Sequence, residues 1–183
     1  TDKKLESVEE MLPILEIGAR ENRPFVIVAE NIEGQALAAL IMNAMRGTLR
    51  IVAVKAPRYG EERRNILKDL ALSVGATFIT RQNNLRLRNV KLTHFGKAKT
   101  FECSKVFTTI VGGGGDLSEV ERQIDLLKAE LSQKESLHEC ERIQERITRL
   151  ASGIAIIHVG AATEIEMIEK KHRVEDALEA VRS

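Results

Sequence analysis

The segment from residue 25 to residue 57, FVIVAENIEGQALAALIMNAMRGTLRIVAVKAP, decides the fold class. It begins with Phe25–Ala29, a continuous apolar and β-branched run that is typical of a strand buried on both faces. Gly34–Met45 has helical composition, and Leu49–Val54 is a second apolar run of strand type. A helix between two buried strands predicts an α/β core.

The flanking segments continue this alternation on both sides. Ser7 and Glu10 have the spacing of a capping box, which predicts a helix that begins just after Ser7 and is kinked near Pro13. Glu61–Val74 is a second amphipathic helix, and Thr77–Thr80 is predicted to be a third strand. The first half of the chain therefore reads as a repeating strand and helix pattern.

The pattern changes after residue 85. Arg86–Val111 reads as short alternating strands broken at Gly96, which predicts a small antiparallel sheet added to the parallel one. Four consecutive glycines, Gly112–Gly115, precede a long helical periodicity over Leu117–Leu150, with Ser136 as the corner of a helical hairpin. The core is thus predicted to be mixed, with helices on its sides.

The last thirty residues form a separate pattern. Ile154–Val159 is a final apolar strand, Gly160 begins a hinge-like bend, and Glu164–Val181 is a charged helix. We place a domain boundary near Ile154. Because the chain starts and stops in mid-pattern, we expect it to be a piece of a longer protein.

Composition narrows the function classes. The 183 residues carry a net charge of only +1, with 43% hydrophobic and 30% charged residues, so neither disorder nor general affinity for polyanions is indicated. Aromatic residues make up 3%, which argues against a platform that stacks nucleic-acid bases. Cys103 and Cys140 have no CxxC spacing, so we expect neither a disulfide nor a zinc site, and a reducing compartment. No apolar run has the length of a membrane span.

The helix Gly34–Met45 is unusual because it contains no charged side chain. Leu37, Leu40, Ile41 and Ala44 form one apolar stripe, and Met42 and Met45 extend the apolar surface beyond the width that one core needs. Either the helix is fully buried or its second face is a binding surface. A buried helix is the commoner case, but flexible methionines on a surface suit a promiscuous binder.

Three other features carry less information. The glycine run lacks the GxxxxGK[ST] and GxGxxG spacings of phosphate loops, and Asp116 and Glu119 would repel a phosphate, so we interpret it as a flexible connection. The basic stretch Arg81–Lys91 has no interleaved aromatics and is interpreted as a solvated strand and turn. The histidines lack ligand or triad spacing; they are His94, His138, His158 and His172.

Several runs together resemble the group I (GroEL-type, sixty-kilodalton) chaperonin family. The match is in register across essentially the whole chain. The runs are Met11–Leu15 (MLPIL), Ala29–Gly34 (AENIEG), Met45–Gly47 (MRG), Val54–Pro57 (VKAP), Val159–Glu164 (VGAATE), Glu169–Lys171 (EKK) and Arg173–Ala177 (RVEDA).

The resemblance implies a fold and a domain plan. It implies a swivelling β/β/α apical domain, with mixed sheets flanked by helices and a helical hairpin, over residues 1–154, with the N-terminal part of that domain missing. Residues 155–183 would be a segment of the intermediate domain, which returns toward an ATP-binding equatorial domain outside this chain.

The resemblance also implies binding residues. In the family, two parallel helices at the mouth of a seven-membered ring form a groove for non-native polypeptides and for the mobile loop of the ten-kilodalton co-chaperonin. The matching positions are Leu12, Leu15, Leu37, Ile41 and Met42, with Asn43 beside them.

Two residues of the last helix match other functional positions of the family. Asp176 matches the carboxylate that promotes ATP hydrolysis in the full-length parent, and Glu164 matches a residue of an inter-subunit salt bridge. ATP and Mg would be cofactors of the parent; we expect none in this chain, no metal, no nucleic-acid or membrane partner, and no enzyme activity of its own. The implied location is the bacterial cytoplasm, with the mitochondrial matrix or plastid stroma as alternatives.

The sequence departs from the family at three places. Arg58-Tyr59-Gly60 stands where the family has Gly-Phe-Gly, the stretch Arg81–Lys91 is basic where the family is acidic, and four glycines replace a Gly-x-Gly pattern. These departures suit a divergent paralogue. Two other hypotheses remain: a nucleotide-binding α/β enzyme, suggested by the alternating core and the glycines, and an adaptor that uses the hairpin Leu117–Leu150 as a partner helix pair.

Overall fold

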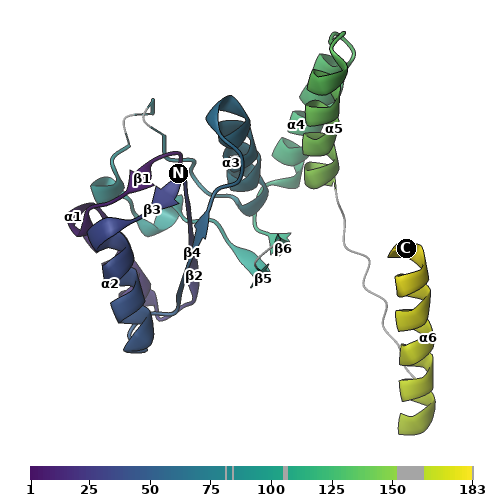
Figure 1. Ribbon diagram of the computed structural model, residues 1–183, viewed down its shortest axis with the longest axis horizontal. Helices are drawn as coiled ribbons and strands as arrows, with labels where there is room; N and C mark the ends of the chain where they lie inside the picture. Colours follow the sequence, from purple (N-terminus) through teal and green to yellow (C-terminus); the bar gives the residue numbers. More distant parts are fainter. Residues whose placement is uncertain (81, 84, 105–106, 152–162, 183) are drawn as a thin grey trace. The chain divides into compact units, whose positions relative to one another are not determined.

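A computed structural model describes residues 1–80, 82–83, 85–104, 107–151 and 163–182 of the chain (Figure 1). The chain divides into two compact units, Thr1–Ser152 and Gly153–Ser183, and each is described by itself. The helices are α1 (Val8–Glu21), α2 (Gly34–Met45), α3 (Gly60–Val74), α4 (Leu117–Leu131), α5 (Leu137–Ala151) and α6 (Glu164–Arg182), with short 3-10 helices η1 (Leu87–Asn89) and η2 (Leu92–His94). The strands are β1 (Lys4–Leu5), β2 (Phe25–Ala29), β3 (Asn31–Ile32), β4 (Ile51–Lys55), β5 (Ala98–Cys103) and β6 (Thr108–Gly113).

The predicted α/β core is confirmed in the first unit. Strands β2 and β4 pair in parallel from Phe25 opposite Ile51 to Ala29 opposite Lys55, with α2 as the connection between them. A second parallel pair joins β1 to β3, and β5 pairs antiparallel with β6. The sheets are therefore mixed, as the change of pattern after residue 85 predicts.

Helix α1 packs closely against the start of β2. Ser7 is its N-cap, and the Ser7 side chain accepts a hydrogen bond from the backbone N–H of Glu9 at 3.2 Å. Gly18 faces the ring of Phe25, where a Cβ would lie 2.0 Å from Cε1, so no larger residue fits without moving the ring. Pro13 lies inside the helix, as expected.

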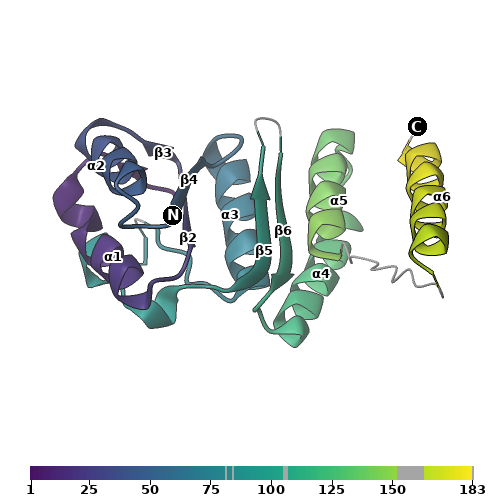
Figure 2. The same cartoon turned by 90° about the horizontal axis from the view of Figure 1, so that it is seen from below.

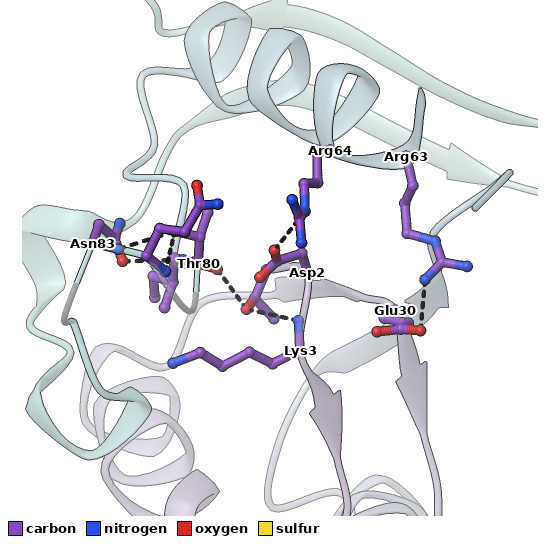
Figure 3. A network of polar contacts seen from close by, with 10 residues as sticks. Asp2, Lys3, Glu30, Arg63, Arg64, Thr80 and Asn83 are labelled. Atoms are coloured by element: carbon purple, nitrogen blue, oxygen red, sulfur yellow. Dashed lines mark hydrogen bonds and ion pairs between the residues drawn. The ribbon is translucent and has the colours of Figure 1, made fainter. Parts of the chain in front are cut away.

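Helix α3 is fastened to the strands by charged contacts (Figure 3). Arg63 Nη1 lies 2.7 Å from Glu30 Oε1 just after β2, and Arg64 Nε lies 3.3 Å from Asp2 Oδ2 just before β1. Both acids are largely covered from solvent, which reduces the screening of these pairs by water. The contacts hold α3 against the residue Asp2 before β1 and the residue Glu30 between β2 and β3.

The prediction of a third strand at Thr77–Thr80 is wrong. The N–H of Thr77 donates to the carbonyl of His94, and side chains bind the next carbonyls: Asn83 Nδ2 donates to Phe78 and Thr1 Oγ1 to Ile79, both at 2.6 Å. The segment is therefore not part of a sheet. Its backbone partners are loops and side chains, which a sequence pattern does not reveal.

Only the second half of the predicted antiparallel region is strand. Residues Leu87–Asn89 and Leu92–His94 form the 3-10 turns η1 and η2 instead. Leu87 and Val90 are three residues apart, so one turn directs both into the core beside α1, where they are buried. Of the basic stretch, Arg86, Arg88 and Lys91 are exposed, which agrees with a solvated turn; Arg81 lies outside the described residues.

The last three of the four glycines, Gly113–Gly115, lie against the C-terminal end of α3. A Cβ on Gly115 would lie 2.1 Å from the carbonyl oxygen of Leu72, and one on Gly113 would lie 2.2 Å from that of Ser73. The backbone approaches α3 more closely than any residue with a side chain permits. The run that we interpret from sequence as a flexible connection thus has a packing role.

The predicted helical hairpin is confirmed as α4 and α5, and Ser136 immediately precedes α5. Asp116 is the N-cap of α4 and accepts a hydrogen bond from the N–H of Ser118 at 3.0 Å. The hairpin has a small core of its own, separate from the core around α1, α2 and β2. Its buried residues are Leu127, Ile143 and Ile147, with Ile124, Leu131 and Leu150 packed around them.

A nearly buried ion pair joins the hairpin to α3. Asp69 of α3 accepts two hydrogen bonds from Arg146 of α5, from Nε at 2.7 Å and from Nη2 at 2.9 Å. The two side chains are 9% and 15% exposed, so the pair is nearly buried. This bidentate contact is the strongest polar link between the hairpin and the rest of its unit.

The second unit contains α6, which agrees closely with the predicted helix Glu164–Val181. Its surface carries i,i+4 ion pairs such as Lys170–Glu166 at 3.0 Å, and it also exposes Ile165 and Ile168. The predicted strand Ile154–Val159 and the hinge at Gly160 lie outside the described residues. No described helix combines the length and the apolar character that a membrane span requires.

Candidate functional site

Helices α1 and α2 lie side by side on one side of the β2–β4 pair (Figures 1 and 2). Each helix is preceded by a short strand of the β1–β3 pair and followed by a strand of the β2–β4 pair. The two strand pairs therefore hold both ends of both helices. This arrangement fixes the surface that the two helices share.

Helix α2 buries one side and exposes the other. Ala36 and Leu40 are 0% and 3% exposed, whereas Ile41 and Met42 are 49% and 51% exposed. The helix is therefore not fully buried. The apolar stripe expected from the sequence does not form one buried side, because of its four members only Leu40 is buried. Ala36 lies on the buried side instead, and its small side chain lets its backbone N–H reach the carbonyl of Glu6 at 3.1 Å.

The residues expected to bind polypeptides divide into two groups. Leu12, Leu37, Ile41 and Met42 are exposed, but Leu15 is buried in the core cluster and does not reach the surface. Met45 is the most exposed large hydrophobic residue of α2, although the family resemblance does not place it among the binding residues. We define the α1–α2 face by its large exposed apolar side chains, which are Leu12, Leu37, Ile41, Met42 and Met45.

Asn43 has a local role at the end of α2. Its Nδ2 donates to the carbonyl of Ala39 at 2.8 Å, and its Oδ1 accepts a hydrogen bond from Thr48 Oγ1 at 3.1 Å. Thr48 also bonds to the backbone carbonyl of Asn43. The amide is thus engaged in closing the helix, next to the α1–α2 face.

Asp176 and Glu164 both lie on α6 and are exposed. Glu164 is the first residue of the helix, and Asp176 lies in its C-terminal half. Both residues belong to the second unit, which is described separately from the α1–α2 face.

The glycine run offers little to a phosphate. The N–H of Gly114 donates to the carbonyl of Lys97 at 2.7 Å, and the N–H of Gly115 donates to that of Ser73 at 3.0 Å. These are the backbone donors that an anion would need. Among the described residues, no group of three or more His, Cys, Asp or Glu side chains has the arrangement of a metal site.

An apolar hollow that the sequence did not indicate lies elsewhere in the first unit. It measures about 490 Å³ and lies beside β2 and β4, next to α3 and the β5–β6 pair. Its lining includes Val28, Val52, Phe78, Phe101 and Ile110. A hydrophobic dye would meet this hollow as well as the α1–α2 face, so dye binding alone does not locate a polypeptide site.

The fold is that of a chaperonin. The structure of the chaperonin gp146 from the bacteriophage EL superposes with a TM-score of 0.62 over 99% of this chain and 36% of that chain, at 20% sequence identity. No protein-family profile matches the chain.

The sequence gives the more specific relationship. The chain is 45% identical over all 183 residues to the chaperonin GroEL of Carsonella ruddii, and it is therefore homologous to GroEL chaperonins. It spans 34% of the length of that curated relative.

Proposed function

We propose that this chain is the part of a chaperonin that binds non-native polypeptides, and that the α1–α2 face is the binding surface. The observation that carries the proposal is α2 itself: a helix with no charged side chain that leaves Leu37, Ile41, Met42 and Met45 in contact with solvent. Because the hydrophobic effect is non-directional, such a surface accepts exposed apolar segments of many sequences. Flexible methionines add the capacity to repack around different partners.

The expected affinity is modest. Burying one leucine-sized side chain contributes about 1.5–3 kcal/mol, and ordering of the peptide removes part of this gain. Two or three anchors therefore give dissociation constants around the micromolar range. Weak and broad binding is what a holder of unfolded chains requires, since tight binding would prevent release.

The wider role of the parent protein is part of the same proposal. Residues 1–154 would act as the apical domain and residues 155–183 as an intermediate-domain segment of a heptameric, ATP-driven folding ring in the bacterial cytoplasm. The ten-kilodalton co-chaperonin would use the same face. Asp176 would orient the attacking water on a Mg–ATP complex held by another part of the parent, and Glu164 would pair with a neighbouring subunit.

The binding surface is tested with one pair of variants. Ile41→Ser on α2 and Leu126→Ser on α4 each remove one exposed aliphatic side chain, and the two side chains are 49% and 60% exposed. Binding of a fluorescent apolar peptide is followed by anisotropy. We expect Ile41→Ser to weaken binding about tenfold or more and Leu126→Ser to leave it unchanged, because only the first residue lies on the α1–α2 face.

The two variants also separate this proposal from the adaptor hypothesis, in which the hairpin binds the partner. Loss of binding in Leu126→Ser alone would favour the hairpin. Equal binding by both variants and the unmodified chain would place the peptide at another surface, such as the apolar hollow beside β4.

The role of Asp176 is tested in the full-length parent. Asp176→Ala should slow ATP hydrolysis severely and leave ATP binding nearly intact, because a residue that orients water acts in the transition state. Hydrolysis is measured at saturating ATP and binding by equilibrium titration. A variant that loses ATP binding and turnover in equal measure would contradict the role.

A further inference from the structure

The N-terminal ends of α1 and α2 lie together. Strand β1 pairs in parallel with β3, Leu5 opposite Ile32, and each strand leads into a helix within three residues. The N–H of Glu33 donates to the carbonyl of Leu5 at 3.0 Å across this junction. Both helices therefore begin at the same end of the α1–α2 face.

The C-terminal ends lie together as well. Helix α1 leads into β2 and α2 leads into β4, and these two strands pair in parallel with Phe25 opposite Ile51. The N–H of Phe25 donates to the carbonyl of Arg50 at 2.9 Å. Both helices therefore end at the opposite end of the face.

The second end is basic. Arg20 lies in the last turn of α1, Arg23 follows the helix, Arg46 is the C-cap of α2, and Arg50 precedes β4. All four are exposed, and in the described part of the chain none of them forms an ion pair. Two exposed acids also lie in this half of α1, Glu16 one turn before Arg20 and Glu21 at the helix end.

The first end is acidic. Glu9 and Glu10 lie in the first turn of α1, Glu33 precedes α2, and Glu6 lies between β1 and α1. All four are exposed, with Lys4 as the exposed cation nearby in sequence. The arrangement matches the helix dipoles, since acids stabilise helix N-termini and bases stabilise C-termini. Between the two ends, α2 carries no charge at all.

We propose that the α1–α2 face selects apolar segments that carry acidic residues at one end and basic residues at the other. The proposal rests on the proposed function and adds to it a charge order, by which we mean acidic residues at one end of the bound segment and basic residues at the other. The acidic end of the bound segment lies over Arg46 and Arg50, and its basic end lies toward Glu9 and Glu33. The 12 residues of α2 span about 18 Å, so an extended apolar core of five or six residues fits between the charged ends.

Peptides of identical composition test the charge order. Each has the same six-residue apolar core with two aspartates and two lysines. In the dipolar peptides both aspartates lie at one end and both lysines at the other, in either chain direction; in the mixed peptide each end has one of each. We expect the better dipolar peptide to bind about three- to tenfold more tightly than the mixed peptide at low salt. The difference should shrink as added salt screens the exposed charges.

Matched charge reversals locate the effect. Arg46→Glu with Arg50→Glu replaces two of the four arginines with acids, so this end is no longer basic and the preference for dipolar peptides should be abolished. Lys55→Glu with Lys68→Glu makes the same change in net charge at exposed positions on β4 and α3, and it should leave the preference unchanged. Circular dichroism confirms that each variant is folded.

The outcomes are distinct. If all three peptides bind with one affinity at low salt, the charge order is wrong and the proposed function stands. If the preference survives Arg46→Glu with Arg50→Glu, it arises elsewhere on the chain and the assignment to this face falls. If no peptide binds to the unmodified chain, the proposed function fails as well.

Discussion

Helix α2 and the α4–α5 hairpin use apolar residues in opposite ways. In α5 the large aliphatic side chains Ile143 and Ile147 are buried in the hairpin core, and the exposed surface is mostly charged or polar apart from Leu137 at the helix start. In α2 only Ala36 and Leu40 are buried, and larger side chains are left exposed. Most large apolar residues of α5 therefore pack in the hairpin core, whereas α2 has a surplus of large apolar side chains that are exposed and contribute little to folding. A surplus of this kind points to binding rather than stability.

The largest effect on folding stability is expected at the ion pair between Asp69 and Arg146, which links the hairpin to α3. Asp69→Ala removes both hydrogen-bond acceptors of Arg146, whose side chain is only 15% exposed, and leaves its charge without a partner. Breaking a buried pair in this way costs about 3–5 kcal/mol, with the lower part of the range expected for this slightly exposed pair. Chemical denaturation measures the loss.

Glu62→Ala is the matched control for this variant. Glu62 also joins α3 to α5, but it lies 3.7 Å from Arg142, which is 47% exposed, and its other partner is Arg58 at 3.3 Å, which is 55% exposed. An exposed pair contributes between about 0 and 1 kcal/mol. Equal losses from Asp69→Ala and Glu62→Ala would mean that the hairpin is held by its apolar contacts instead.

Substitutions of two neighbouring residues of α2 test whether its exposed apolar side chains contribute to folding. Leu40→Ala should cost about 2–5 kcal/mol of folding free energy because it opens a cavity in the core, whereas Ile41→Ala should change it by only about 0.5 kcal/mol. Peptide binding should show the reverse order. Thermal and chemical unfolding of both variants, measured beside peptide affinity, decide whether α2 has the two separate faces described above.

Much of this contrast could be predicted from the sequence. The absence of charge in Gly34–Met45 indicates an unusual helix, and the periodicity of residues 117–150 predicts the hairpin. The assignment of faces could not be predicted, because Ala36, a small residue, marks the buried side of α2 and Leu15 of α1 faces the core. Apolar content alone does not distinguish a core leucine from a binding leucine.

Long-range contacts account for the other differences. The strand predicted at Thr77–Thr80 is not formed, and the carbonyl of Ile79 accepts a hydrogen bond from the side chain of Thr1, 78 residues away. The pairing of Asp69 with Arg146, 77 residues apart, has no local signal either. The clustering of arginines at one end of α1 and α2 follows from the pairing of β2 with β4, although Arg23 and Arg50 are far apart in the chain.

The smallest effect on folding stability is expected at the N-terminal cap of α4. Asp116 caps α4 through its side chain, whereas the residue that precedes α2 makes no side-chain cap. The side-chain hydrogen bond from Ser118, followed by the backbone N–H of Ser118, lowers the pKa of Asp116 below its usual value of 3.8. A carboxylate with a lowered folded pKa stabilises the fold above its unfolded pKa, and this contribution is lost as the pH falls through the folded pKa.

Asp116→Asn isolates this contribution, because asparagine caps a helix about as well as aspartate but does not titrate. At neutral pH the two proteins should have nearly the same melting temperature, with the unmodified chain slightly higher because its charge favours the helix N-terminus. Below about pH 4 the unmodified chain should lose stability relative to the variant, since the protonated carboxyl is a poorer acceptor. The difference should be small, as the side chain is exposed and water competes for it. A constant difference in melting temperature from pH 7 down to pH 3 would show that the cap of α4 does not depend on the charge of Asp116.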